Sequence, residues 1–328
     1  MDTATSRRSL LAAGSLALMP GLVSSLVPGL AGSRAVADTL AGRALTGHGA
    51  EPSIRLATLT DIHYADADPR GNRYYRDSIP KVAKAIKAIN ESAAASPLAF
   101  TALLGDLIDS RDTPIEEGGL EQEIGYLKTI ETHLANLNTD RHYAFGNHCV
   151  HTLTKDEFAE HSGAQASFYS FDRPFTRGSG SLHVVVLDAC FTSDGTPYAR
   201  RNFHWTDANI PAHELAWLKA DLDATNSPTL VLTHQRLDGE GNTTIRNAPA
   251  AREILQQSGK VLAVLQGHAH ENSQSLIEGI PYLVMRAVVE GAGVENHAFG
   301  LVEVHADHSL LVHGFGTQAD HEYTPARR

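Results

Sequence analysis

The chain has 328 residues, of which 42% are hydrophobic and 20% are charged, so it is long enough for a large domain and too apolar to be mainly disordered. Its net charge of −11, with the histidines neutral, argues against a protein that binds nucleic-acid polymers through a basic face. Two cysteines exclude a disulfide-rich scaffold and a four-cysteine zinc site, whereas 18 histidines direct attention to metal ligands.

The N-terminal segment has the pattern of an export signal. Twin arginines, Arg7-Arg8, precede an uncharged run over 10–32, and a small-residue cleavage site follows at 35–37. We therefore expect a twin-arginine signal peptide over 1–37, read by the twin-arginine export machinery, and a linker over 38–50. A membrane anchor is the alternative interpretation of the uncharged run. Cleavage would leave a periplasmic or secreted protein without stable membrane association.

Short apolar runs then alternate with helical patterns. Strands are expected at 54–59, 100–104, 143–145, 183–187, 229–232 and 261–265. Helices are expected around 82–89 and at 118–137, 214–222 and 251–257. Four more strands follow at 275–277, 282–289, 299–305 and 310–313, and the polar end from Thr317 is expected to hang loose or pack lightly. The pattern predicts an α/β fold of two packed sheets with helices outside, in one domain over 51–328.

Five of these strands are followed by metal-ligand residues. The groups are Asp61-Ile62-His63, Gly105-Asp106-Leu107-Ile108-Asp109, Gly146-Asn147-His148, His234 and Gly267-His268-Ala269-His270. Ligands bind at the carboxyl ends of strands in open α/β sheets, so the groups can converge on one site. In an extended D-x-H segment, residues i and i+2 point the same way, so Asp61 and His63 can reach one ion, as can His268 and His270. The adjacent glycines allow a close approach of the backbone.

The chemistry of this set indicates the kind of metal. Carboxylate, imidazole and amide oxygen without thiolate suit Mn, Fe, Zn or similar divalent ions, and do not suit a structural zinc site. The candidate ligands are Asp61, His63, Asp106, Asn147, His234, His268 and His270. Seven ligands exceed the needs of one ion, so two ions that share a carboxylate fit better. Such a pair, roughly 3.5–4 Å apart, would polarise a phosphoryl oxygen.

D-x-H, G-D-x-x-D, G-N-H, a single His after a strand and G-H-x-H, in this order, resemble the calcineurin-like metallophosphoesterases over nearly the whole chain after the export segment. The segment Arg73-Tyr74-Tyr75-Arg76-Asp77-Ser78, with Gly-Asp-Leu-Ile-Asp and Leu187-Asp188-Ala189, is similar to the manganese-dependent ADP-ribose/CDP-alcohol diphosphatase branch. The resemblance implies a four-layer αββα sandwich of two mixed β-sheets flanked by helices. It also implies two divalent metal ions as cofactors, with manganese favoured.

The same resemblance implies a role for each residue. The first ion would be held by Asp61, His63, Asp106 and His270. Asp106 would bridge to the second ion, completed by Asn147, His234 and His268. His148 would contact the phosphoryl group or protonate the leaving oxygen, and Asp109 would stand behind the ligands. A hydroxide that bridges the ions would attack phosphorus in line, which cleaves a phosphate ester or pyrophosphate bond of a small phosphorylated substrate.

Cys149 departs from the family pattern. Members commonly have Asp or Glu after the G-N-H histidine, so the chain either lacks a carboxylate that orients His148 or uses another acid. In an oxidising compartment Cys149 and Cys190 could pair or could remain free thiols, because the sequence gives no Cα separation.

Several interpretations of function remain open. The leading one is a hydrolase of ADP-ribose/CDP-alcohol-like substrates. Alternatives are a broad phosphomonoesterase, a cyclic-nucleotide or lipid-headgroup phosphodiesterase, and a non-catalytic metal- or phosphate-binding protein. Four arginines either clamp a phosphate or are solvated: Arg73, Arg76, Arg201 and Arg236. Four aromatic residues either stack on a substrate ring or pack in the core: Tyr74, Tyr75, Phe203 and Trp205.

Overall fold

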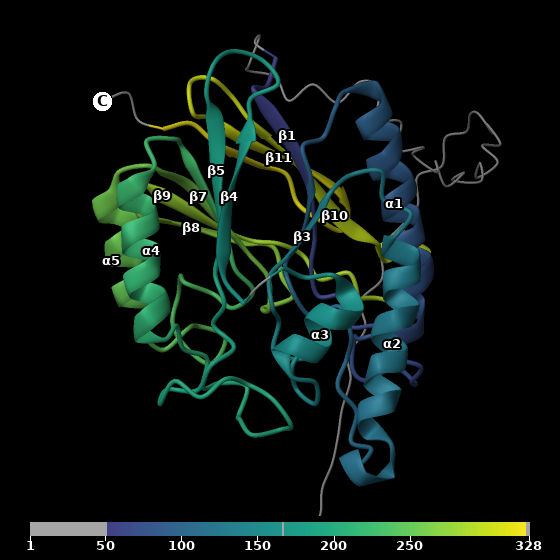
Figure 1. Ribbon diagram of the computed structural model, residues 1–328. Coiled ribbons are helices and arrows are strands. Elements are labelled where there is room, and N and C mark those ends of the chain that lie inside the picture. Colours follow the sequence, from purple (N-terminus) through teal and green to yellow (C-terminus); the bar gives the residue numbers. More distant parts are fainter. Residues whose placement is uncertain (1–50, 166, 326–328) are drawn as a thin grey trace, which may run out of the picture. The chain divides into compact units, whose positions relative to one another are not determined.

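The structure, a computed structural model, describes residues 51–165 and 167–325 (Figure 1). These residues form two six-stranded sheets with α-helices on their outer faces. The expected export signal at 1–37 and the linker at 38–50 lie outside the described residues. Every helix in the two described ranges is too short or too polar to cross a lipid bilayer.

The first sheet has the strand order β12-β11-β10-β1-β2-β3. β1 (Ile54–Leu59), β2 (Thr101–Leu103) and β3 (Arg141–Tyr143) run parallel, with Ala57 opposite Thr101. The other three strands continue the sheet antiparallel from β1: β10 (Ala298–Val304), β11 (Leu310–Gly316) and β12 (His321–Tyr323).

The second sheet has the order β4-β5-β6-β7-β9-β8. Its four central strands run parallel: β5 (Ser181–Val186), β6 (Thr229–Leu232), β7 (Val261–Gln266) and β9 (Ile280–Val284). The two edges are antiparallel: β4 (Tyr169–Pro174) and β8 (Ser273–Ile277). Both sheets are therefore mixed, and the sequence-based prediction of the sheet type is confirmed.

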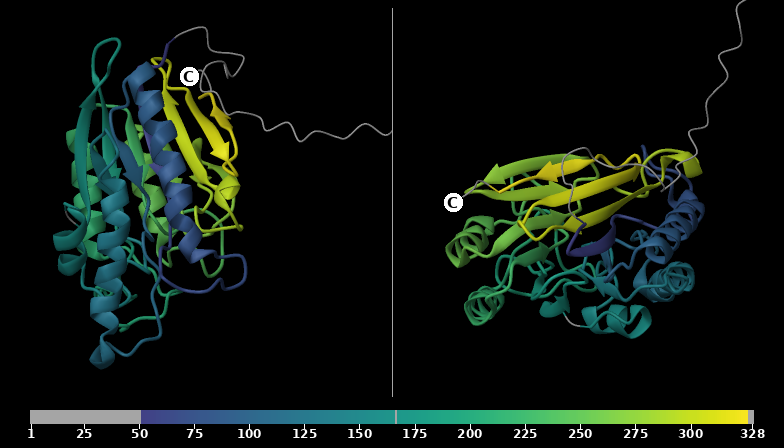
Figure 2. Two further views of the ribbon diagram at one scale, coloured as in Figure 1. Left: turned by 90° about the vertical axis from the view of Figure 1, so that its right-hand side faces the viewer. Right: turned by 90° about the horizontal axis from the view of Figure 1, so that it is seen from above.

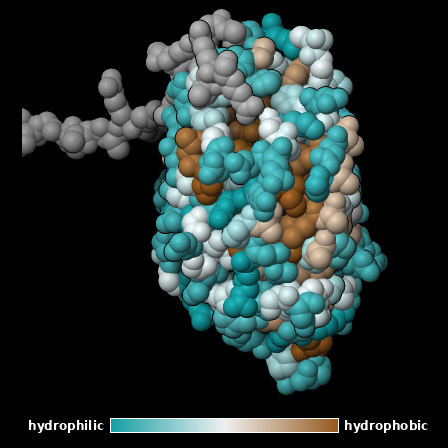
Figure 3. Space-filling view, turned by 90° about the vertical axis from the view of Figure 1, so that its left-hand side faces the viewer, coloured by the Kyte–Doolittle hydropathy of each residue, from teal (hydrophilic) through white to brown (hydrophobic). Residues whose placement is uncertain are grey.

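Helices cover the outer face of each sheet, as Figure 2 shows for α1 (Ser78–Ala95) and α2 (Gly119–Leu134) on one side and α4 (Ala212–Ala224) and α5 (Ala248–Ser258) on the other. Three short 3-10 helices lie in the connections, at Tyr75–Asp77, Ile115–Glu117 and Val294–Asn296. Figure 3 shows the side near α4 and α5, where hydrophilic residues cover most of the surface between smaller hydrophobic areas.

The alternation of side chains along the strands produces three apolar layers. In β5, Val184 and Val186 belong to the core between the sheets, whereas Val185 belongs to the core beneath α4 and α5. In β1, Leu56 lies in the central core and Leu59 in the core beneath α1 and α2. Each fully buried aliphatic side chain contributes roughly 1.5–3 kcal/mol. Three cores between four layers confirm the αββα sandwich.

One α-helix and two strands were not predicted from the sequence. α3 (Lys155–Ser162) is short and has little apolar periodicity, but Thr154 Oγ1 accepts from the Glu157 N–H and Glu157 Oε2 accepts from the Thr154 N–H in a capping box. β4 is a partly exposed edge strand without an apolar run. β12 was also missed: it lies in the chain end expected to hang loose or pack lightly, and it pairs with β11, placing His321 opposite Val312.

Several expected strands have limits that differ from the observed ones, among them the third strand and the run 282–289. The third strand lies at 141–143 rather than 143–145. The run 282–289 is not one strand, because β9 ends at Val284 and the chain then crosses from the second sheet to the first. The Met285 N–H donates to Gln266 O beside β7, and the Val289 N–H donates to Asp61 O after β1. An apolar run can therefore serve both sheets, and this crossing passes the strand ends where the candidate ligands lie.

Two glycines allow the strand-end loops to approach one another. A Cβ on Gly146 would lie 2.2 Å from both the backbone nitrogen and Oδ1 of Asp106. A Cβ on Gly267 would lie 2.2 Å from Thr60 Oγ1 and 2.6 Å from Asp61 Oδ2. Such separations are far inside van der Waals contact, so any side chain here would push the loops apart.

We expect Gly146→Ala to lower the free energy of unfolding by at least ~2 kcal/mol, because the new methyl group meets backbone that cannot move aside. Gly125→Ala is the matched control. Gly125 lies within α2, no atom stands within 4 Å of the place that the alanine methyl group would take, and alanine should stabilise the helix by about 0.5–1 kcal/mol. Urea unfolding monitored by circular dichroism measures both changes, and equal stability of the two variants would contradict the clash.

His183 ties the edge strand β4 to helix α4 through two carboxylates. Its Nδ1 lies 2.9 Å from Asp172 Oδ1 and its Nε2 lies 2.8 Å from Asp221 Oδ2. Burial alone would lower the pKa of His183, but the carboxylates of Asp221 and Asp172 outweigh it and raise the pKa above 6.5. The imidazolium donates to both carboxylates, and Asp221, the less exposed of the two, carries more of the stabilisation.

Because the folded-state pKa of His183 is raised, its stabilisation is full below about pH 6.5 and is lost as the pH rises through the folded-state value. We therefore expect the stability difference between the wild type and His183→Gln to shrink as the pH is raised from 6 to 9. Urea unfolding at several pH values measures this difference. A difference that stays constant or grows over the range would show that His183 does not titrate in this pair.

Candidate metal centre

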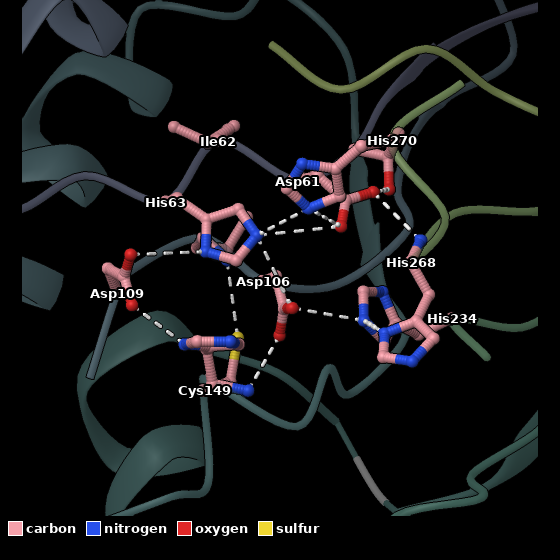
Figure 4. Close-up of polar contacts among 12 residues, drawn as sticks. Asp61, Ile62, His63, Asp106, Asp109, Cys149, His234, His268 and His270 are labelled. Carbon is pink, nitrogen blue, oxygen red and sulfur yellow. Dashed lines mark hydrogen bonds and ion pairs between the residues drawn. The ribbon is translucent and has the colours of Figure 1, made fainter. Parts of the chain in front are cut away.

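The strand-end loops bring the predicted ligands together from both sheets (Figure 4). Three groups have ligand atoms within 4.8 Å of one another: Asp61 with His63 and His270, Asp106 with His234 and His268, and His63 with Asp106 and His148. Asp106 links the groups, since its Oδ2 lies 3.5 Å from His63 Nε2 and 3.1 Å from His234 Nε2. Asp61 Oδ1 lies 3.2 Å from His270 Nε2. A carboxylate between two clusters has the geometry of a bridging ligand.

The backbone at these residues is not extended, so that part of the prediction is wrong. Five of the nine non-glycine residues with positive φ in the described ranges are candidate ligands: Asp61 (φ 51°), His63 (47°), Asp106 (50°), His268 (68°) and His270 (62°). Asp and His enter the left-handed region more readily than most residues, but each such conformation still costs about 1–3 kcal/mol. The turn also separates His268 and His270, which join different clusters instead of facing one ion.

Buried atoms without hydrogen-bond partners show that a cation fits here. Asp61 Oδ1, Asn147 Oδ1 and His268 Nε2 are all buried and make no hydrogen bond, although Asp61 Oδ1 lies within ion-pair distance of His270 Nε2. Buried polar atoms are normally satisfied, so such a concentration calls for a ligand. Asn147 also stands between Gly146, which abuts Asp106, and His148, whose N–H donates to Asp106 Oδ1 at 2.8 Å. The backbone of Asn147 is therefore held close to Asp106 by its neighbours in the chain.

Hydrogen-bond partners on Nδ1 orient the imidazole rings of His234 and His270. His234 Nδ1 donates to Leu104 O at 2.8 Å, and His270 Nδ1 lies 2.8 Å from Glu290 Oε1. Each ring therefore turns its Nε2 toward the centre, where it meets another ring nitrogen: His63 Nε2 at 3.0 Å from His270 and His268 Nδ1 at 3.2 Å from His234. Partners on the far nitrogen of a ligand histidine fix its tautomer and raise its basicity.

The electrostatics of the cluster favour bound positive charge. Burial opposes the charged form of Asp106, but His234 and His148 hold the pKa of its carboxyl well below the usual range. Against the effect of burial, Asp106 and Asp61 raise the pKa of His234 to about 9. Burial lowers the pKa of His63 to about 4, so this ring is neutral and free to ligate at pH 7. Without metal, protonated His234 supplies the positive charge that neutralises the carboxylates. Bound cations would replace this proton and supply that charge instead.

Asp109 orients His148. Its Oδ1 lies 2.8 Å from His148 Nδ1, and its Oδ2 lies 3.8 Å from His63 Nδ1. Burial opposes protonation of His148, but Asp106 and Asp109 raise the pKa of its imidazole. The side chain of His148 is 22% exposed, more than the side chains of Asp61, His63, Asp106, His234 and His270, so it is partly accessible to solvent. Of the two sequence-based alternatives, the structure favours another acid in place of the usual carboxylate.

Both cysteines belong to the core. Cys149 is fully buried, its sulfur accepts from the Leu107 N–H at 3.3 Å, and burial raises the pKa of its thiol to about 12. The Cys190 thiol donates to Phe145 O at 3.6 Å. The structure contains both as free thiols, and the alternative in which they pair does not occur in it.

Two residues that support the site were missed in the sequence. Glu290 follows the run 282–289 and holds His270. Lys81 is fully buried, and its Nζ donates to four successive carbonyls over 288–291, at 3.0, 3.1, 2.9 and 2.6 Å. No motif marks Glu290. Lys81 lies four residues before Ala85, on the apolar face of the predicted helix. A lysine on an apolar face was the one signal in the sequence of a buried charge with a structural role.

The contacts of the candidate arginines and aromatic residues show which of them lie near the metal centre. Arg73 Nη1 lies 3.8 Å from Asp109 Oδ2, too far for a hydrogen bond but at the rim of the centre. The other three arginines are held elsewhere: Arg76 by Asp66 and Asp68, Arg201 by the carbonyls of Arg111 and Thr113, and Arg236 by Asp238. Tyr75 is buried in the core, whereas Trp205 is 41% exposed.

Solved structures share this architecture. A dimetal phosphatase from Danio rerio is 17% identical, with a TM-score of 0.69, and the match covers 84% of this chain and 100% of that chain. GAP50, the anchor in the inner membrane complex of Plasmodium, is 11% identical, with a TM-score of 0.54, over 85% of this chain and 90% of that chain. At these identities the likeness shows the fold. Among curated proteins, none matches the sequence.

The sequence itself shows the family. The calcineurin-like phosphoesterase model matches residues 54–272, which is 219 of 328 residues and includes every candidate ligand from Asp61 to His270. Glu290 and the strands β10 to β12 lie beyond the match. The chain therefore belongs to the calcineurin-like phosphoesterases, a family of hydrolases that use two divalent metal ions to cleave phosphoesters.

Proposed function

We propose that this protein is an exported phosphohydrolase that cleaves phosphate ester or pyrophosphate bonds in small substrates of the ADP-ribose/CDP-alcohol kind, with manganese as its favoured metal. The observation that carries the reaction type is the pair of clusters joined through Asp106, with His148 held beside them by Asp109. A protein that only binds metal or phosphate would need the metal ligands, but it would not need His148 oriented beside them.

The chain's own residues divide the work. One ion is assigned to Asp61, His63 and His270, the other to Asn147, His234 and His268, and Asp106 is assigned to both. Two bound divalent ions supply a nucleophile at neutral pH and take up charge on the phosphoryl oxygens. His148, whose Nδ1 is fixed by Asp109, holds a proton that its Nε2 can give to the leaving oxygen. Arg73, at the rim, is placed to bind a non-reacting phosphate oxygen.

The substrate assignment rests on the sequence segment 73–78, whose similarity is to the ADP-ribose/CDP-alcohol diphosphatases. A broad phosphomonoesterase and a cyclic-nucleotide or lipid-headgroup phosphodiesterase remain the alternatives, because metals polarise any phosphate ester and the pocket walls choose among them. Export rests on the twin-arginine pattern over 1–37, which would deliver the folded enzyme to the periplasm or the exterior.

Chelation should abolish turnover, and manganese should restore it, because both clusters need cations to offset buried carboxylates. We expect Asn147→Ala and His268→Ala to lose at least about 100-fold in rate, while His133→Ala, on the outer helix α2, keeps the wild-type rate. The measurement is hydrolysis of ADP-ribose, CDP-choline, cyclic AMP and nitrophenyl phosphate side by side. Undiminished turnover by metal-free protein, or none by metal-loaded protein, would refute the proposal.

His148→Ala should keep both ions but lose about 10²–10⁴-fold in rate, since general acid catalysis contributes on that scale. Asp109→Asn should lose less, because the amide oxygen can still accept from His148 Nδ1 while its negative charge is gone. Elemental analysis alongside the kinetics separates the two roles. Loss of metal from His148→Ala in proportion to its loss of rate would make His148 a ligand instead of an acid.

A further inference from the structure

Trp205 lies beside the metal centre without being part of it. Its ring centroid is 5.8 Å from that of His268, with the two planes inclined by 60°. The large hydrophobic side chains exposed among the described residues are Trp205, Leu276 and Val294. Single exposed hydrophobic residues are common, but an indole next to a ligand histidine is in reach of whatever binds at the metals.

The chain on both sides of Trp205 is fixed. Phe203 stacks on the buried Tyr198, with ring centroids 3.5 Å apart and planes within 2°. Asp207 Oδ1 accepts from Arg246 Nη1 at 2.7 Å, and the Ser193 N–H donates to Asp207 Oδ2 at 3.2 Å. The intervening segment is thus anchored at each end, while the indole itself stays exposed. A ring held in place by its neighbours loses little conformational freedom when a ligand stacks on it.

The connection that carries Trp205 is unusually long, covering residues 187–211 between β5 and α4. Connections in compact domains usually have about 4–6 residues, and longer ones with specific contacts often bind ligands. A hollow of about 490 Å³ begins at the next residue, Thr206, and is also lined by Gly239, Arg246 and Arg252. The chain next to Trp205 thus borders a hollow as well as the metal centre.

We propose that Trp205 is a stacking platform that selects substrates with a planar ring, a nucleobase above all, beside the phosphate that is cleaved. This inference rests on the proposed function, because the metals place the phosphate. An indole face stacks on any aromatic ring, and base–aromatic stacking has a strength that is largely independent of which base is present. Sugar phosphates and alkyl phosphates lack such a ring and gain nothing from the platform.

Adenosine 5′-monophosphate and ribose 5-phosphate test the platform, since they share the sugar phosphate and differ in the base. Each is used to inhibit hydrolysis of the best substrate in the panel. We expect the wild type to bind the nucleotide about ten-fold more tightly than the sugar phosphate, and Trp205→Ala to remove this preference while its constant for ribose 5-phosphate stays within about two-fold. Trp205→Phe should keep most of the preference, and Trp217→Phe, on α4 against Phe168, all of it.

Fluorescence gives a second measurement that needs no turnover. The chain has two tryptophans, so Trp217→Phe leaves Trp205 as the only one. Adenosine 5′-monophosphate should quench its emission in the manganese-loaded protein, and ribose 5-phosphate should not. Equal loss of affinity for both probes in Trp205→Ala, or an unchanged preference, would overturn the platform and leave the hydrolase intact. Absence of turnover with normal quenching would overturn the hydrolase alone.

Discussion

The buried carboxylate of Asp106 is the group around which the rest of the centre is arranged. Its Oδ1 accepts the His148 N–H, and its Oδ2 lies between His63 and His234. An ionised carboxylate with no solvent contact would be strongly unfavourable without positive partners. Imidazoles from both sheets supply part of that charge, and bound cations would supply the rest. The centre therefore requires the two sheets to meet at one edge, and this requirement accounts for the features that surround it.

Those features hold backbones unusually close together. Gly146 lets the third loop lie against Asp106, and the first loop, with left-handed residues at Asp61 and His63, runs beside the second loop and donates to Gly105 O and Asp106 O. His234 from the second sheet donates to Leu104 O of the first. The crossing segment 285–289 bonds to both sheets, and Lys81 fixes the carbonyls at its end and just beyond it. The strain of the left-handed residues is thus offset by hydrogen bonds from residues that need not touch a substrate.

The sequence predicted that the candidate ligands converge, and they do, because each one follows a strand and the carboxyl ends of parallel strands share an edge. The prediction of the local backbone was wrong. It assumed an extended chain, in which side chains i and i+2 point the same way, whereas these residues have left-handed backbone conformations. Asp109 as the partner of His148, and Glu290 as the partner of His270, depend on contacts between distant loops. No local pattern encodes such contacts, so they could be found only in the folded chain.

The contrast between strand-end residues and contacts between distant loops also explains why the motifs indicate the reaction type but do not identify the substrate. Every motif residue lies at a strand end, where the sheets fix its position and the metals fix its chemistry. The connection over 187–211 carries no ligand and is held by contacts of its own, including Phe203 on Tyr198. A loop anchored independently of the metals can change its exposed side chain without disturbing Asp106. Selection of a substrate at Trp205 is therefore physically separable from the hydrolysis of its phosphate.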